Sequence, residues 1–160
     1  MSNPRSEQRL TGDQLAQELA PQETLKRIIT EDTTESIQAL TATAERIGSR
    51  LARDVTTSQI RNIFGTVRAI EQDVKTIDDD RPLPLPVQRE LQMLRPKLAY
   101  QYGRVQGRDD DPGKAAMGAL TKILSDSIGL VGADTRRFRN FVDFFEAILA
   151  YHRRYGGRTN

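Results

Sequence analysis

The chain has 160 residues, of which 37% are hydrophobic and 29% charged, with a net charge of +2 and no cysteine. This length allows one domain with a modest core, and the lack of cysteine excludes disulfides, thiol catalysis and zinc–thiolate sites. No apolar run reaches the roughly 20 residues of a membrane span. The polar N-terminus has no apolar signal segment, so we expect a cytoplasmic protein.

Two segments precede the main body of the chain. Residues 1–22 are polar and without periodicity, which predicts a disordered leader. Residues 23–53 are expected to form a helical extension, because apolar residues recur there at steps of three and four. The residues that share this helical face are Ile37, Leu40, Ala44, Ile47 and Leu51. We expect this amphipathic helix to dock on the main body, since it is too short to indicate a coiled coil.

Residues 54–160 are predicted to form a helical-bundle domain, and its first helix begins near Thr56. Thr56 and Gln59 have the spacing of a capping box. The apolar stripe that follows consists of Ile60, Ile63, Phe64, Val67, Ile70 and Val74. Gly65 weakens this helix by about 1 kcal/mol relative to Ala. Either another helix packs closely there or a nucleic-acid backbone approaches.

The sequence RPLPLP at 81–86 predicts an extended connector, because each proline restricts the residue before it. Pro86 can start the next helix. The apolar stripe of this helix consists of Val87, Leu91, Leu94, Leu98 and Tyr102. The stripe keeps its phase across Pro96, so we expect the helix to continue after a kink around its own core.

Two more helices complete the predicted bundle. One runs from about Lys114 to Val131, and the last begins at Asp134 or Thr135 and ends before Gly156. The buried face of the last helix is predicted to contain Phe138, Phe141, Val142, Phe145, Ile148, Leu149 and His152. No segment alternates as a strand does. The predicted fold class is therefore all-α, a compact helical bundle of about four core helices plus an N-terminal amphipathic helix.

No arrangement of residues indicates catalysis, a metal site or a cofactor. The single histidine, His152, falls on an apolar stripe, where packing is commoner than catalysis. A serine nucleophile would lack a base. The acidic triplets at 78–80 and 109–111 lack the alternating ligands of a calcium loop, so we expect solvated loop acids. These absences predict a protein that is not an enzyme and needs no cofactor.

Basic residues are the remaining feature. Of the 24 basic residues, 19 are Arg and 5 are Lys, which suits phosphate recognition or reflects a GC-rich genome. Three groups are predicted on helix surfaces: Lys97 with Gln101, Arg104 and Arg108; Arg61 with Arg68; and Arg136 with Arg137 and Arg139. Asp143 is an alternative partner for Arg139. Each group alone is typical of a solvated face, whereas together they favour a polyanionic partner.

Three stretches occur in one order along the chain: TTSQIRNIF at 56–64, LRPKLAYQYGR at 94–104 and FFEAILAYHRRYGG at 144–157. Together they resemble the small helical subunit, of the Csm type, of type III-A CRISPR RNA-guided effector complexes. The resemblance covers residues from about 54 to the end. It implies a compact helical bundle, several copies of which stack head to tail beside the backbone subunits that carry the CRISPR RNA.

The resemblance also implies a function and its partners. Such subunits line the groove in which guide RNA and target RNA pair, bind RNA without reading its sequence, and serve antiviral defence. Target cutting belongs to the backbone subunit, and DNA cutting and cyclic oligoadenylate synthesis belong to the large subunit. The expected partners are therefore guide RNA, target RNA, the backbone and large subunits, and further copies of this chain.

Carried over by position, the resemblance places RNA contacts on the basic rows. The first candidates are Arg61, Lys97 and Arg104, with Arg68, Arg95 and Arg108 behind them. The chain departs from the family pattern in residues 1–53, which exceed the usual short leader. It departs again at Tyr102, which either extends the core or stacks on a base. The alternative function is a helical protein–protein interaction module that binds no RNA.

Overall fold

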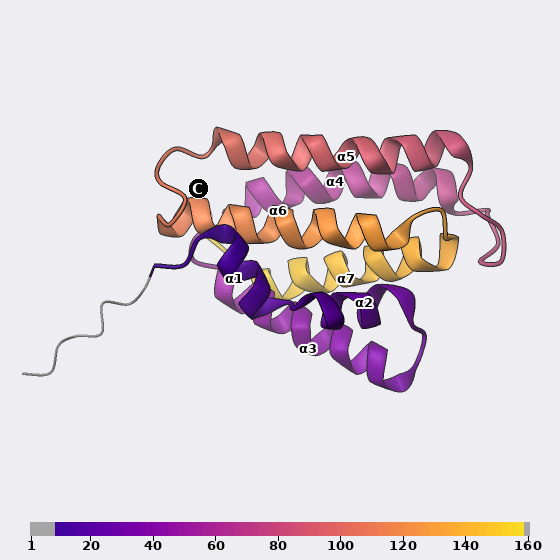
Figure 1. Ribbon diagram of the computed structural model, residues 1–160, viewed down its shortest axis with the longest axis horizontal. Helices are drawn as coiled ribbons and strands as arrows, with labels where there is room; N and C mark the ends of the chain where they lie inside the picture. Colours follow the sequence, from indigo (N-terminus) through magenta and orange to yellow (C-terminus); the bar gives the residue numbers. More distant parts are fainter. Residues whose placement is uncertain (1–8, 159–160) are drawn as a thin grey trace, which may run out of the picture.

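The computed structural model describes residues 9–158 (Figure 1). These residues form seven α-helices, and their only β pairing is two isolated bridges, which confirms the predicted all-α fold. The helices are α1 (Gly12–Leu19), α2 (Gln22–Thr30), α3 (Thr34–Leu51), α4 (Thr57–Val74), α5 (Leu85–Arg104), α6 (Pro112–Val131) and α7 (Thr135–Arg154). Within this part of the chain, no helix combines the length and apolar character needed to cross a membrane.

The helices α4 to α7 form a four-helix bundle (Figure 1). Contacts run from α4 to α5, α5 to α6, α6 to α7 and α7 back to α4, so the four helices enclose one core. The bulkiest buried side chains come from α7: Phe138, Phe141, Phe144 and Phe145. Phe64 of α4 packs edge-on against Phe145, with ring centroids 5.1 Å apart. Apolar burial of this kind is the main force that holds the helices together.

Close approach of α3 to α7 depends on a glycine. A methyl group added to Gly48 would lie 2.6 Å from the backbone nitrogen of His152 and 2.7 Å from Cβ of Tyr151. Gly65 of α4 is different, because such a methyl group would meet no described atom within 4 Å. Close helix packing therefore explains Gly48 and does not explain Gly65.

The N-terminal region contains three helices where the sequence predicted one. Residues 12–19 form α1, so the expectation of a disordered leader is wrong for them. Thr11 caps α1 reciprocally with Gln14: each backbone N–H donates to the other side chain. Helix α1 buries its apolar side on α6 through Leu15, Ala16 and Leu19. Residues 1–8 of the predicted leader lie outside the described residues.

One predicted core residue of α3 faces outward. Ile37 is 62% exposed, whereas the preceding Ser36 is buried. The Ser36 hydroxyl accepts a hydrogen bond from the backbone N–H of Thr33 at 2.9 Å and donates to the carbonyl of Glu31 at 3.1 Å. This cap holds Ser36 inward, so Ile37 points away from the core. The buried face then continues as predicted through Ala44, Ile47 and Leu51.

Asp79 joins the connector before α5 to α7, so this acidic triplet is not simply solvated. Its carboxylate accepts hydrogen bonds from Arg139 and, at 3.3 Å, from Arg136. Arg136 also pairs with Asp32 at 3.0 Å. The hydrogen bond from Arg139 lowers the pKa of Asp79, so its stabilising effect is lost as pH falls through that lowered value. Arg139 therefore pairs with Asp79 and not with Asp143.

Residues 152–158 are held by hydrogen bonds to the turn between α3 and α4. His152 is buried, and its Nε2–H donates to the carbonyl of Val55 at 2.7 Å. Gly157 lies against the imidazole ring, where a Cβ would come within 2.3 Å of Nδ1. The backbone N–H of Arg158 donates to the carbonyl of Ala52 at 2.8 Å. His152 thus has the packing role that the sequence predicted.

Candidate nucleic-acid interface

A groove runs between α4 and α5 in two adjoining parts, and we call it the α4–α5 groove. The first part has a volume of about 310 Å³ and a largely apolar lining that includes Ile63, Met93, Leu94, Leu98 and Tyr100. The second part has a volume of about 760 Å³ and a polar lining that includes Ser58, Gln59, Arg61 and Arg104. Asn62 and Gln101 border both parts, so the two parts adjoin each other.

Three of the six predicted RNA-binding residues border this groove. Arg61 comes from α4, one position after the buried Ile60, and the capping box at Thr56 fixes the start of that helix. Lys97 and Arg104 come from α5, which runs unbroken through Gly103 and ends at Arg104. Residues four and three apart share one side of a helix, so Lys97, Gln101 and Arg104 follow one edge of the groove.

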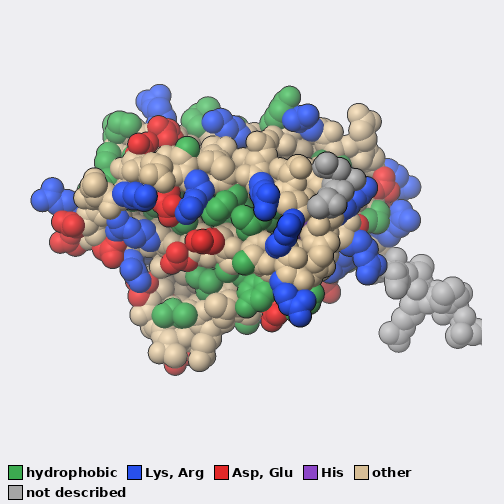
Figure 2. All heavy atoms as spheres, turned by 180° about the vertical axis from the view of Figure 1, so that it is seen from behind, with side chains coloured by type: hydrophobic (Ala, Val, Ile, Leu, Met, Phe, Trp, Pro, Cys, Tyr) green, Lys and Arg blue, Asp and Glu red, His purple; other side chains and the backbone are tan. Residues whose placement is uncertain are grey.

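The charge of the α4–α5 groove is uncompensated. No Asp or Glu lines either of its parts, whereas carboxylates line three other hollows of the described residues. Within residues 9–158 the side chains of Arg61 and Lys97 make no ion pair or hydrogen bond, and Arg104 interacts with the ring of Tyr100 alone. Figure 2 shows many Lys and Arg side chains on one face of the molecule, with apolar and some acidic side chains exposed between them.

Arg68, predicted in one row with Arg61, belongs to a different hollow. Its guanidinium pairs with Glu71 at 3.1 Å and lies 5.6 Å from the centre of the Phe64 ring. The hollow that it borders lies between α4 and α7 and also contains Asp143. The charge of Arg68 is therefore partly neutralised within the protein.

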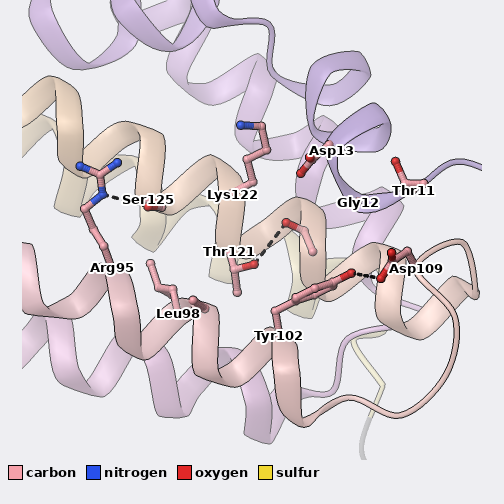
Figure 3. Close-up of a pocket in the computed structure, with 12 residues that line it drawn as sticks. Thr11, Gly12, Asp13, Arg95, Leu98, Tyr102, Asp109, Thr121, Lys122 and Ser125 are labelled. Atoms are coloured by element: carbon pink, nitrogen blue, oxygen red, sulfur yellow. Dashed lines mark hydrogen bonds between the residues drawn. The ribbon is translucent and has the colours of Figure 1, made fainter.

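Arg95 points into a pocket between α1, α5 and α6 (Figure 3), whereas Lys97 borders the α4–α5 groove. Its Nε–H donates to the Ser125 hydroxyl at 3.0 Å. The pocket has a volume of about 390 Å³ and also exposes Asp13 and Lys122. The structure therefore does not bring Arg95 together with Arg61, Lys97 and Arg104.

Tyr102 borders the same pocket and is half-buried. A methyl group on Gly118 would lie 3.1 Å from its ring, so the ring packs on α6 and extends the core. Lys114 Nζ lies 4.7 Å from the ring centre, and the hydroxyl donates to Asp109 at 2.5 Å (Figure 3). Of the two roles open to Tyr102, the core role is the one observed, because its ring face is already covered.

Arg108 lies outside the helix on which it was predicted to align. Helix α5 ends at Arg104, and Gly107 adopts φ of 114°, a conformation that glycine favours. The backbone N–H of Arg108 donates to Asp111, and its side chain pairs with Asp110 at 3.4 Å. The predicted row of cations therefore ends at Arg104, and the second acidic triplet is engaged by its neighbours.

Tyr102 should ionise only in strongly alkaline solution. The hydrogen bond to Asp109, aided by burial, raises the pKa of Tyr102 from 10.0 to about 12. The folded state then holds this proton more tightly than the unfolded state, so the bond's stabilisation is complete below about pH 10 and lost as pH rises through about 12.

Titration of tyrosinate absorbance measures this ionisation. The Tyr102→Phe variant should lack a step near pH 12, and Asp109→Asn should move that step to lower pH. If the Asp109→Asn variant and the wild-type protein give the same tyrosinate titration curve, the hydrogen bond between Tyr102 and Asp109 does not form in solution.

Sequence reasoning missed the apolar side of the groove. Tyr100 and Met93 are 66% and 53% exposed, and both border its first part. The signal was available in the spacing, because neither residue falls on the apolar stripe of α5. The groove offers amides, hydroxyls and cations without a histidine or carboxylate, so its chemistry is that of binding an anion. No group of three potential ligands in the described chain is placed to hold a metal ion.

A family model described as Csm2 Type III-A matches residues 34–158, more than half of the chain. The matched region begins with α3, about twenty residues before the resemblance seen in the sequence, which starts near residue 54. Helices α1 and α2 lie before the matched region. Both helices of the α4–α5 groove lie within the matched region. No curated protein and no solved structure matches the chain. The chain belongs to the Csm2 family, the small subunit of type III-A CRISPR complexes.

Proposed function

We propose that this chain is a non-catalytic RNA-binding subunit whose copies stack along the groove where guide and target RNA pair. In this role it stabilises target binding for antiviral defence in the cytoplasm, together with the backbone and large subunits. The observation that carries the proposal is the α4–α5 groove, where three cations face solvent without any lining carboxylate. A strand of phosphates supplies the counter-charge that the protein does not.

Binding at this site is expected to ignore RNA sequence. Arginine and lysine recognise phosphate oxygens, and phosphate contacts fix the position of a strand without reading its bases. The open position at Gly65 supports the proposal, since α4 has no side chain there to keep a strand away and no packing reason to lack one. A subunit that works with every guide RNA has to bind RNA without recognising its sequence.

A second candidate function is a protein-interaction module that binds no RNA. Among residues 9–158, three of the five exposed large hydrophobic residues lie on α5, namely Leu85, Met93 and Tyr100. Exposed apolar side chains with cations between them could also bind an acidic protein surface. The two candidates differ in what Arg61, Lys97 and Arg104 touch in the assembled complex.

Ultraviolet crosslinking of the complex purified from its native host separates the two functions. RNA should become covalently attached to this chain, and the Arg61→Ala, Lys97→Ala, Arg104→Ala triple variant should lose most of that RNA while still copurifying. The matched control replaces Arg53, Arg153 and Arg154, three exposed cations outside the groove, and should crosslink as the wild type does. A wild-type chain that copurifies with protein subunits but never crosslinks to RNA supports the interaction module instead.

A further inference from the structure

Two tyrosines of α5, two residues apart, have opposite surroundings. Tyr102 is packed on α6, and Asp109 accepts a hydrogen bond from its hydroxyl. Tyr100 is 66% exposed, and within residues 9–158 its hydroxyl has no hydrogen-bond partner. Its ring borders the apolar part of the α4–α5 groove. A ring left in water at the edge of a recess presents a face that a flat ligand can cover.

The neighbours of Tyr100 combine three kinds of contact within one stretch of groove. The Arg104 guanidinium lies 5.8 Å from the centre of the Tyr100 ring. Lys97 borders the apolar part of the groove together with Tyr100. Ile63, Leu94 and Leu98 line the recess with apolar surface. Cations along a groove next to an exposed aromatic ring are the arrangement with which proteins hold single-stranded nucleic acid.

The polar groups between these contacts suit a base of any kind. Asn62 and Gln101 border both parts of the groove, and each side-chain amide can donate and accept hydrogen bonds. Every base has a π face, so stacking on tyrosine does not select a sequence. The apolar part of the groove therefore adds affinity without adding sequence specificity.

We infer that the α4–α5 groove holds an unpaired nucleotide, with its base stacked on Tyr100 and the adjoining phosphates on Arg61, Lys97 and Arg104. The inference rests on the RNA binding proposed above and names the state of the RNA that the groove takes. A base inside a continuous duplex has both faces covered by its neighbours. Tyr100 therefore stacks on a base only where the strand is single or a base is turned out of the helix.

Fluorescence titration of the full chain at low salt tests this, with a short single-stranded RNA that carries 2-aminopurine as the probe. Tyr100→Leu keeps an apolar side chain and removes the aromatic face. Its affinity should fall about 5- to 150-fold, and the fluorescence change on binding should be lost. The dependence of affinity on salt should stay unchanged, because it counts neutralised phosphates.

Two matched variants isolate the aromatic face. Tyr100→Phe keeps the ring and should bind as the wild type does. Tyr102→Phe makes the same change on the other side of α5 and should leave RNA affinity unaltered. The same probe annealed to its full complement should bind more weakly than the single strand.

The outcomes separate this inference from the proposed function. If Tyr100→Leu binds RNA with wild-type affinity, base stacking on Tyr100 is overturned. RNA binding at the groove is still supported if the triple variant of Arg61, Lys97 and Arg104 shows a reduced salt dependence. Tighter binding of the full duplex overturns the stacking inference as well. If Tyr100→Leu impairs association between copies and leaves RNA affinity intact, the ring belongs to a protein contact. A wild-type chain that binds no RNA at low salt contradicts both proposals.

Discussion

Replacing Gly48 with leucine should lower the free energy of unfolding by about 3 kcal/mol or more, since overpacking a closely packed site costs about that much. For a chain of this size the loss corresponds to roughly 6–12 °C in Tm. The reason is that the atoms facing Gly48 are backbone and Cβ atoms of α7, at 2.6 to 2.9 Å from a built Cβ. Such atoms cannot rotate away, so α3 has to move off α7.

The matched control is Gly65→Leu, the same change in the middle of α4. No described atom lies within 4 Å of a Cβ built there, so leucine meets no obstacle. Helix propensity then favours the variant by up to about 1 kcal/mol. Urea unfolding followed by circular dichroism measures both effects. Equal stability of the two variants would show that α3 does not approach α7 as described.

The second large effect concerns RNA binding by the Arg61→Ala, Lys97→Ala, Arg104→Ala variant. For single strands, the logarithm of affinity falls with the logarithm of salt by about 0.7 for each neutralised phosphate. Loss of three phosphate contacts should therefore make the slope shallower by about 2. Binding measured across a series of salt concentrations gives this slope directly.

Removing positive charge anywhere on the chain weakens RNA binding somewhat, so the control must match the charge. The variant with Arg53, Arg153 and Arg154 replaced by alanine loses the same charge outside the α4–α5 groove. Its slope should remain close to that of the wild type. A similar loss of slope in both variants would mean that RNA binds through diffuse charge and not at the groove.

The bundle was predictable because its helices are long. In α4, the six predicted apolar residues recur over four turns. Phe64 is partly buried, and the other five are buried: Ile60, Ile63, Val67, Ile70 and Val74. Repetition over several turns identifies a face whatever packs against it. Helix α1 has 8 residues, too few to show a repeated apolar spacing, and the sequence alone did not predict it.

Side-chain direction explains which site residues the sequence could find. Lys97 and Arg104 lie seven residues apart, a spacing that returns to the same side of a helix. Arg95 lies two residues before Lys97, which turns it by about 200° and into the pocket beside α6. Arg95 and Lys97 are close in sequence, which suggested that they share a site, but they lie on different sides of the helix.

The other site predictions depended on loop conformation and on contacts between distant segments, which the sequence pattern does not give. The alignment of Arg108 required a helix past Gly107, and that glycine turns the chain instead. The partners of Asp79 come from α7, about sixty residues later, and no local pattern indicates them. The role of Tyr100 depends on what surrounds it across α4, which the spacing along α5 alone cannot give.

An atomic structure of the assembled complex with guide and target RNA tests the central claim most directly. The account predicts phosphate oxygens within about 3.2 Å of the side-chain nitrogens of Arg61, Lys97 and Arg104, in each copy that lies along the RNA. If all three side chains face open water or another protein subunit while RNA runs elsewhere, the α4–α5 groove is not the RNA-binding surface.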